Sequence, residues 1–244
     1  MNRAAAGPGA GVPGFSRLNA CIIDLDGTLV DTLGDFEVAL NQMLAELSRP
    51  PVTRNVIERL VGQGSEHLIR AVLAQGERQP GGADVGVPED LFQSAWAAYQ
   101  RIYRQINGEH SAVYAGVREG LQALQTLGLR MACLTNKPTA FARPLLQVKG
   151  LDGYFSEVFG GDAFERKKPD PLPLLKTCEA LGVAPGRTLM VGDSINDARA
   201  ARKAGCPVVL LTYGYNHGEP IRSVDADGYF DSLQELAALL GRRG

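Results

Sequence analysis

The sequence predicts an α/β fold, in which a doubly wound, Rossmann-like parallel sheet carries an inserted all-helical cap. Two observations predict this fold. Short apolar runs typical of buried strands alternate along the chain with stretches of helical periodicity, and such alternation is typical of a parallel sheet covered by helices on both faces. The alternation is interrupted once, over residues 34–112, where helical patterns continue without a buried-strand run.

The predicted strands are short and apolar, as expected for strands that are buried on both faces of a sheet. The first covers residues 18–25 and ends in acidic residues. The others cover residues 129–135, 157–159, 188–192 and 207–212.

The predicted helices of the sheet domain carry apolar residues at helical spacing. In the first of them, Val117, Leu121 and Leu124 lie on one face. Gly205 is a typical helix stop before the last strand. These helices cover residues 117–127, 138–148, 171–181, 194–204 and 232–240.

The interval 34–112 is predicted to be helical. Its first part has one apolar helical face, a second helical stretch is interrupted at residues 62–64, and a Gly-rich segment at residues 79–87 is expected to form a loop. A last helix over residues 91–106 carries Trp96, Tyr99 and Tyr103, which are expected to pack in the core of this unit.

The sequence pattern divides the chain into three parts. Residues 1–16 are rich in Ala, Gly and Pro and are expected to form a flexible tail. Residues 17–33 and 113–244 together form the predicted catalytic core, and residues 34–112 form the cap inserted after its first strand.

Charge and composition exclude several classes of protein. The chain has 244 residues and a formal net charge of −2, whereas a dedicated nucleic-acid-binding protein is usually strongly basic. No apolar run reaches the length of about 18 residues that a membrane helix needs. The N-terminal stretch lacks the hydrophobic core of a signal peptide. We therefore expect a cytoplasmic monomer or small homo-oligomer, whose four cysteines are buried thiols.

Four groups of polar residues lie at or near the ends of predicted strands. Because ligands of open parallel sheets bind beyond the carboxyl ends of the strands, these groups are expected to meet in one crevice. Each group alone is also compatible with a solvated loop or a helix N-cap, so the ordered set is the specific signal. The groups are Asp24 with Asp26, Thr135 with Asn136 and Lys137, Lys168 ahead of Pro169, and Asp193 with Asp197.

Several carboxylates in one crevice repel one another, by about 4 kcal/mol for a pair ~4 Å apart at an effective dielectric constant of about 20. A proton, a lysine or a metal ion must offset this repulsion. The predicted ligands are all oxygen atoms, which favours Mg²⁺ over Zn²⁺. Lys168 supplies further positive charge.

A carboxylate in line with a phosphorus atom can attack it and form an aspartyl phosphate, and Asp24 is the candidate nucleophile. Mg²⁺ and Lys168 would stabilise the charge that develops in the transition state. Thr135 and the backbone N–H of Asn136 can donate hydrogen bonds to the phosphate. Asp26 can protonate the leaving alcohol and then take a proton from the attacking water.

The ordered motifs resemble those of the haloacid dehalogenase superfamily, in its phosphatase branch, over most of the chain. The matching residues are the Asp-x-Asp-x-Thr run from Asp24 to Thr28, then Thr135, then Lys168 (with Lys167 as the less favoured choice), and finally Asp193 and Asp197. The resemblance implies that Asp24 and Asp193 bind Mg²⁺ through their side chains and Asp26 through its backbone carbonyl. It also implies that residues 34–112 close over the substrate.

Four further segments are similar to the bacterial phosphoglycolate phosphatases within that superfamily. They are residues 61–64, 113–117, 135–138 and 211–216. The similarity implies hydrolysis of 2-phosphoglycolate to glycolate and phosphate. The N-terminal tail and the Gly-rich loop depart from the pattern of these phosphatases, and neither touches a motif.

The core motifs leave other activities open. Phosphomutases and phosphatases of other small phosphate esters, such as N-acetylmuramic acid 6-phosphate, share the same core residues, because the cap sets the substrate. A dehalogenase would lack the second acid, Asp26. A phospho-accepting receiver-like switch would not need an insert as long as residues 34–112.

A substrate with a carboxylate needs a cation or backbone N–H groups to bind it. In the cap, Arg59, Arg70, Arg101 and Arg104 are candidates, although each is also expected on a solvated helix face. Residues 213–216 are expected to form a loop beside the site.

Overall fold

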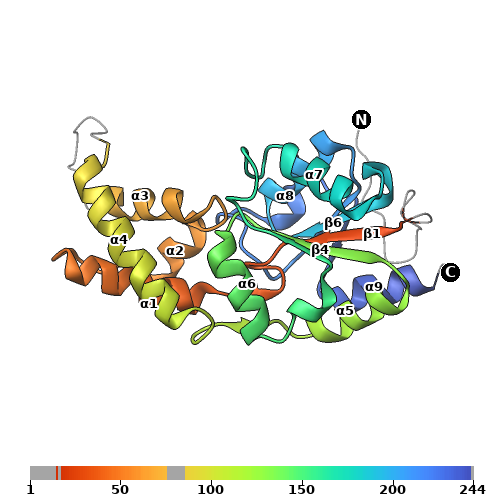
Figure 1. Ribbon diagram of the computed structural model, residues 1–244, viewed down its shortest axis with the longest axis horizontal. Coiled ribbons are helices and arrows are strands. Elements are labelled where there is room, and N and C mark those ends of the chain that lie inside the picture. The colour runs from red at the N-terminus through yellow and green to blue at the C-terminus, as the bar shows by residue number, and fades with distance from the viewer. Residues whose placement is uncertain (1–14, 16–17, 76–85, 243–244) are drawn as a thin grey trace.

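The structure is a computed structural model that describes residue 15, residues 18–75 and residues 86–242. Figure 1 shows an elongated molecule, with four helices of the N-terminal half at one end and the sheet with its covering helices at the other. The expected tail over residues 1–16 lies outside the described residues, except for Phe15, which is buried in the core. Most of the expected Gly-rich loop at residues 79–87 also lies outside them.

Six parallel strands form the main sheet: β1 (Ala20–Ile23), β4 (Arg130–Leu134), β5 (Glu157–Phe159), β6 (Thr188–Gly192), β7 (Val208–Leu211) and β8 (Gly228–Phe230). Their order across the sheet is β5-β4-β1-β6-β7-β8. Five of them lie where the apolar runs predict strands, which confirms the doubly wound α/β fold. The pattern does not predict β8, because this edge strand has three residues and two of them are only half buried.

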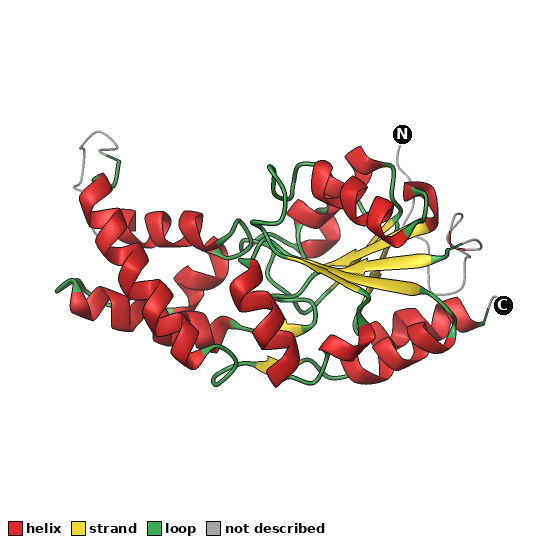
Figure 2. Ribbon diagram, in the orientation of Figure 1, coloured by secondary structure: helices red, strands yellow, loops and turns green. Residues whose placement is uncertain are grey.

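Helices cover both faces of the sheet (Figure 2). On one face lie α5 (Val117–Thr126), α6 (Thr139–Val148) and α9 (Leu233–Gly241), and on the other lie α7 (Leu172–Leu181) and α8 (Ile195–Ala204). Each begins within one residue of its predicted start. Short 3₁₀ helices lie in the connections, at Asp152–Tyr154, Pro185–Arg187 and Ile221–Ser223.

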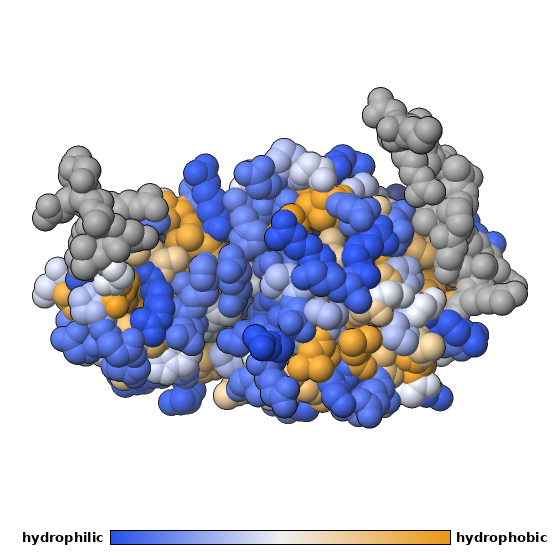
Figure 3. Space-filling view, turned by 90° about the horizontal axis from the view of Figure 1, so that it is seen from above, coloured by the Kyte–Doolittle hydropathy of each residue, from blue (hydrophilic) through white to orange (hydrophobic). Residues whose placement is uncertain are grey.

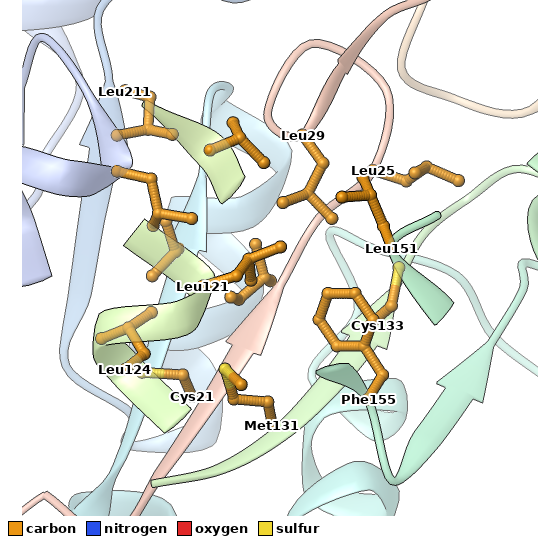
Figure 4. Packing of buried hydrophobic residues seen from close by; sticks show 14 of the residues in the cluster. Cys21, Leu25, Leu29, Leu121, Leu124, Met131, Cys133, Leu151, Phe155 and Leu211 are labelled. Atoms are coloured by element: carbon orange, nitrogen blue, oxygen red, sulfur yellow. The ribbon is translucent and has the colours of Figure 1, made fainter. Parts of the chain in front are cut away.

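The central strand β1 is held by two hydrophobic cores because its side chains alternate between the faces of the sheet. Cys21 and Ile23 belong to the core beneath α5 and α9, whereas Ala20 and Ile22 belong to the core beneath α7 and α8. Figure 4 shows Cys21 beside Leu121 and Leu124 of α5 in the first of these cores. Burying one such Leu side chain contributes about 1.5–3 kcal/mol, so packing on both faces stabilises the position of β1.

The helical unit has a core of its own. Its helices are α1 (Leu33–Glu46), α2 (Arg54–Leu60), α3 (Ser65–Gln75) and α4 (Glu89–Ile106). Tyr99 and Tyr103 of α4 stack in this core with ring centroids 5.3 Å apart, as expected for the aromatic side chains of this helix. Phe141 of α6 and Tyr215 join the same cluster, so the helical unit packs against the sheet domain.

The two segments that connect the helical unit to the sheet domain are joined to each other by hydrogen bonds. β2 (Val30–Asp31) pairs antiparallel with β3 (Ala112–Val113). Nearby, the buried carboxylate of Asp35 accepts hydrogen bonds from the backbone N–H groups of Gly108, at 2.9 Å, and His110, at 2.7 Å. The limits 34–112 of a separate cap domain stay a prediction.

The described surface offers few large apolar side chains. On the face in Figure 3, hydrophilic residues prevail and the hydrophobic patches are separate. All four cysteines are free and buried, as expected. No helix in the described ranges is long and apolar enough to cross a membrane.

Candidate active site

The predicted catalytic residues lie at the carboxyl edge of three adjacent strands. Asp24 directly follows β1, Thr135 directly follows β4, and Asp193 directly follows β6. Because β1 lies between β4 and β6 and all three are parallel, their carboxyl ends meet at one edge. Lys168 reaches the same edge from the loop between β5 and α7.

The ammonium group of Lys168 is buried at the centre of this edge. Its Nζ donates to the carbonyl oxygen of Leu134 at 2.8 Å and to Oδ1 of Asp197 at 2.7 Å, and it lies 3.0 Å from Oδ1 of Asp24. These three acceptors match the three ammonium hydrogens. Although burial opposes the charge, Asp197 and Asp24 raise the pKa of Lys168 above its usual value. Lys167, in contrast, is exposed.

The carboxylate of Asp197 is fully engaged within the protein. Oδ1 accepts from Lys168, and Oδ2 accepts from the hydroxyl of Ser194 at 2.8 Å and from its backbone N–H at 3.2 Å. The pair forms a capping box at the start of α8. Asp197 therefore supports Lys168 and the loop after β6, and it has little capacity left for a ligand.

Asp24 and Asp193 face each other across the crevice in an environment that disfavours two negative charges. Burial raises the pKa of Asp24 to about 7, against the opposing effect of Lys168. Burial, together with the charges of Asp197 and Asp24, raises the pKa of Asp193 well above its usual range. One carboxylate oxygen each of Asp24, Asp193 and Asp197 lies within 4.8 Å of the other two.

The loop after β7 fixes the carboxylate of Asp193. Oδ1 accepts from the hydroxyl of Thr28 at 2.8 Å, and Oδ2 accepts from the backbone N–H of Tyr215. A Cβ atom at Gly27 would lie 2.2 Å from Oδ2 of Asp193, and one at Gly214 would lie 2.2 Å from its Cβ. Both glycines are therefore needed for this close approach, and the segment 213–216 contacts the site directly.

A lysine that the motif analysis does not assign lies beside Asp26. The Nζ of Lys137 lies 3.0 Å from Oδ1 of Asp26 and donates to the hydroxyl of Tyr103 at 2.7 Å. Its side chain is 2% exposed. The residue is visible in the sequence as part of Thr-Asn-Lys, but its burial depends on α4 and could not be predicted from the motif.

The residues at this edge fit a divalent cation. Four carboxylates and two lysines meet here: Asp24, Asp26, Asp193, Asp197, Lys137 and Lys168. When all six are ionised, their net charge is −2, which one divalent cation would neutralise. The raised pKa values of Asp24 and Asp193 also indicate that a bound proton or cation would stabilise the site. An all-oxygen donor set is the kind that Mg²⁺ prefers.

Thr135 and Asn136 follow the carboxyl end of β4. Thr135 is buried, and its hydroxyl accepts from the backbone N–H of Lys137 at 3.2 Å. The side chain of Asn136 binds the backbone of Lys168 in both directions, at 2.8 and 3.0 Å, and donates to the carbonyl oxygen of Gly62 at 2.9 Å. This side chain therefore holds the lysine loop and the helical unit together, while a phosphate-binding role of the backbone N–H stays a prediction.

A cavity of about 30 Å³ lies between this edge and the helical unit. Asp24, Asp26 and Thr135 line it from the sheet domain, and Phe36 and Ser65 are among the residues that line it from the helical unit. A larger cavity of about 550 Å³ lies where β4 and β5 begin, at the other end of the strands, and its lining contains none of the predicted site residues.

The cap arginines do not line the cavity in the part of the chain that the structure describes. Arg70 pairs with Glu66 and Glu89, and Arg101 pairs with Glu46, all at the surface. These are the solvated helix faces that the sequence predicts.

Comparisons with known proteins agree with this geometry. Residues 21–211 match the model of the haloacid dehalogenase-like hydrolases. A phosphoglycolate phosphatase of Thiobacillus denitrificans is 44% identical over 91% of this chain and 96% of that protein, and one of Nitrosospira multiformis is 42% identical over the same shares. The crystal structure of a predicted phosphoglycolate phosphatase from Haemophilus somnus superposes with a TM-score of 0.86 at 34% identity, covering 91% of this chain and 98% of that one.

Proposed function

The chain belongs to the haloacid dehalogenase-like hydrolase family, and we propose that it is a phosphoglycolate phosphatase that uses Mg²⁺ and an aspartyl-phosphate intermediate. As a phosphoric monoester hydrolase it acts on a small phosphate ester. The substrate is proposed from relatives named phosphoglycolate phosphatase that are 40–44% identical to this chain. The products would be glycolate and phosphate.

One observation carries the mechanism: Oδ1 of Asp24 lies 3.0 Å from Nζ of Lys168, and Asp24 lines the cavity together with Thr135. In the proposed reaction, the Asp24 carboxylate attacks phosphorus and the ester oxygen leaves. Water then attacks the phosphorus of the aspartyl phosphate, which releases phosphate and restores Asp24. Lys168 stabilises the charge on the transferred group, and the Thr135 hydroxyl donates to it.

The ligands proposed for Mg²⁺ are the side chains of Asp24 and Asp193 and the backbone carbonyl of Asp26. When bound there, Mg²⁺ would offset the negative charge of the crevice and of the phosphate. Asp197 is proposed as a support, because its two oxygens are already occupied by Lys168 and Ser194.

Asp26→Asn is expected to slow hydrolysis by ~10²-fold or more, because we assign to Asp26 the proton transfers to the leaving oxygen and from the attacking water. Binding of Mg²⁺ should remain largely intact, since the proposed ligand is the backbone oxygen. Turnover numbers and the Mg²⁺ concentration for half-maximal activity measure the two effects. Turnover equal to that of the wild type would remove Asp26 from the acid–base role.

The helical unit α1–α4 is proposed to act as the cap. Phe36, Val61 and Leu68 of this unit line the cavity that contains Asp24. The cavity, at about 30 Å³, is far smaller than the ~300–1,000 Å³ of typical ligand pockets. We therefore infer that the helical unit moves away from the sheet domain to admit substrate.

A panel of phosphate esters tests the proposed substrate. With Mg²⁺ present, kcat/KM for 2-phosphoglycolate is expected to exceed that for sugar phosphates, N-acetylmuramic acid 6-phosphate and pyrophosphate by at least about tenfold. Chelation of the metal should stop turnover, and added Mg²⁺ should restore it. A preference for a sugar phosphate would assign the chain to another phosphatase activity, and phosphorylation of Asp24 without turnover would indicate a switch.

A further inference from the structure

The cavity contains a buried cation that the proposed chemistry leaves without a role. Of the described residues that line it, Lys137 is the one with a positive charge. Lys168 already serves the nucleophile and Asp197 through all of its ammonium hydrogens. A second lysine at the same site therefore calls for a separate explanation.

The hydrogen bonds of Lys137 leave room for a ligand. Among the described residues, its Nζ has two hydrogen-bond partners, Oδ1 of Asp26 and the hydroxyl of Tyr103. An ammonium group has three hydrogens, so one remains for a further acceptor. The ammonium also lies over the rings of Phe36, at 4.5 Å, and Tyr103, at 4.7 Å, which fixes its position against the cavity wall.

The environment of Lys137 favours a negatively charged ligand. Lys137 belongs to the sheet domain, and the cap side of the cavity that faces it is lined by apolar or uncharged side chains, among them Phe36, Val61, Ser65 and Leu68. A carboxylate that binds against this side of the cavity loses its hydration. A charged hydrogen-bond donor must compensate for that loss. Lys137 is that donor, and its side chain is only 2% exposed, so bulk water screens the interaction little.

We propose that Lys137 binds the carboxylate of the substrate and selects 2-phosphoglycolate over uncharged esters, an inference that rests on the proposed function. Lys137 follows Thr135 by two residues, and its backbone N–H contacts the Thr135 hydroxyl. In 2-phosphoglycolate a single methylene joins the carboxylate to the ester oxygen. Lys137 lines the same cavity as Thr135 and Asp24, so a phosphate bound by those two residues keeps the carboxylate in the cavity that Lys137 lines. Because Lys137 also holds Asp26, the leaving oxygen comes to lie beside the proposed acid.

The test compares two substrates in three proteins. Phosphoglycolamide has the shape of 2-phosphoglycolate but carries a neutral amide in place of the carboxylate. Lys137→Met keeps the length of the side chain and removes its charge. Lys176→Met removes a surface lysine that pairs with Glu179 and serves as the control. The measured quantity is the ratio of kcat/KM for the two substrates, with the thermal unfolding midpoint of each protein recorded alongside.

The wild type and Lys176→Met are expected to prefer 2-phosphoglycolate. Lys137→Met is expected to be slower with both substrates, because Asp26 loses a partner, but its preference should fall by roughly 30-fold, the effect of one hydrogen bond to a charged group. The loss should appear mainly in KM. Where Lys137→Met does not fold, Lys137→Gln, which retains a donor for Asp26, is measured instead.

An equal loss with both substrates would overturn the inference, because Lys137 would then act through Asp26 alone. A wild type that turns over sugar phosphates as well as it turns over 2-phosphoglycolate would instead refute the proposed function. The two failures are distinguishable because the first concerns the variant and the second concerns the wild type.

Discussion

Asp24→Asn is expected to abolish turnover and to leave the fold intact. An amide cannot attack phosphorus to form an aspartyl phosphate, so kcat should fall by at least about 10³-fold. The fold should tolerate the change, because burial already raises the pKa of Asp24 to about 7 and thus disfavours the charge that the amide lacks. Steady-state kinetics with 2-phosphoglycolate and thermal unfolding measure the two outcomes.

The matched control is Asp152→Asn, which changes an exposed carboxylate of the same domain and should retain full activity. Acid quenching during turnover of a substrate with labelled phosphate should leave label on the wild-type chain and none on Asp24→Asn. Activity of the variant within tenfold of the wild type would refute the assignment of Asp24 as the nucleophile.

Lys168→Met is expected to lose both activity and stability. The substitution keeps an unbranched side chain but leaves Asp24 and Asp197 without the ammonium that now lies 3.0 and 2.7 Å from them. Breaking a buried ion pair on one side costs about 3–5 kcal/mol. Loss of the cation beside the transferred phosphate should lower kcat/KM by roughly 10²–10³-fold. Urea unfolding and kinetics at saturating Mg²⁺ measure these changes.

Lys167→Met is the control for this variant, since the neighbouring lysine is exposed and should contribute little to either quantity. The double variant Asp24→Asn/Lys168→Met should be more stable than Lys168→Met alone, because one of the two unpaired carboxylates is then neutral. If Lys168→Met matched the wild type in unfolding free energy and in kcat/KM, the lysine would have neither role.

The order of strands and helices could be predicted from periodicity, because the main strands are buried on both faces and the helices are amphipathic. The edge strand β8 and the short ladder of β2 with β3 could not. Each has two or three residues, too few for a period, and each forms only because a neighbouring strand supplies its hydrogen bonds.

The site was predictable where it depends on strand ends and unpredictable where it depends on packing between distant segments. Asp24, Thr135 and Asp193 directly follow apolar strands, so their common edge follows from the parallel sheet. Tyr215 reaches Asp193 across 22 positions of the chain, and Lys137 reaches Asp26 across 111. No local pattern records such contacts.

By itself, the sequence determined the α/β core, the helical interval after the first strand, and the ordered polar residues at the strand ends, because periodicity and strand direction are local properties. Only the tertiary structure decided how the charges are paired. It placed Lys168 on Asp24, engaged Asp197 with Lys168 and Ser194, and buried Lys137 under the aromatic side chains of α1 and α4. The pairing of these charges depends on which side chains are buried next to one another. That is determined by how the helical unit packs against the sheet.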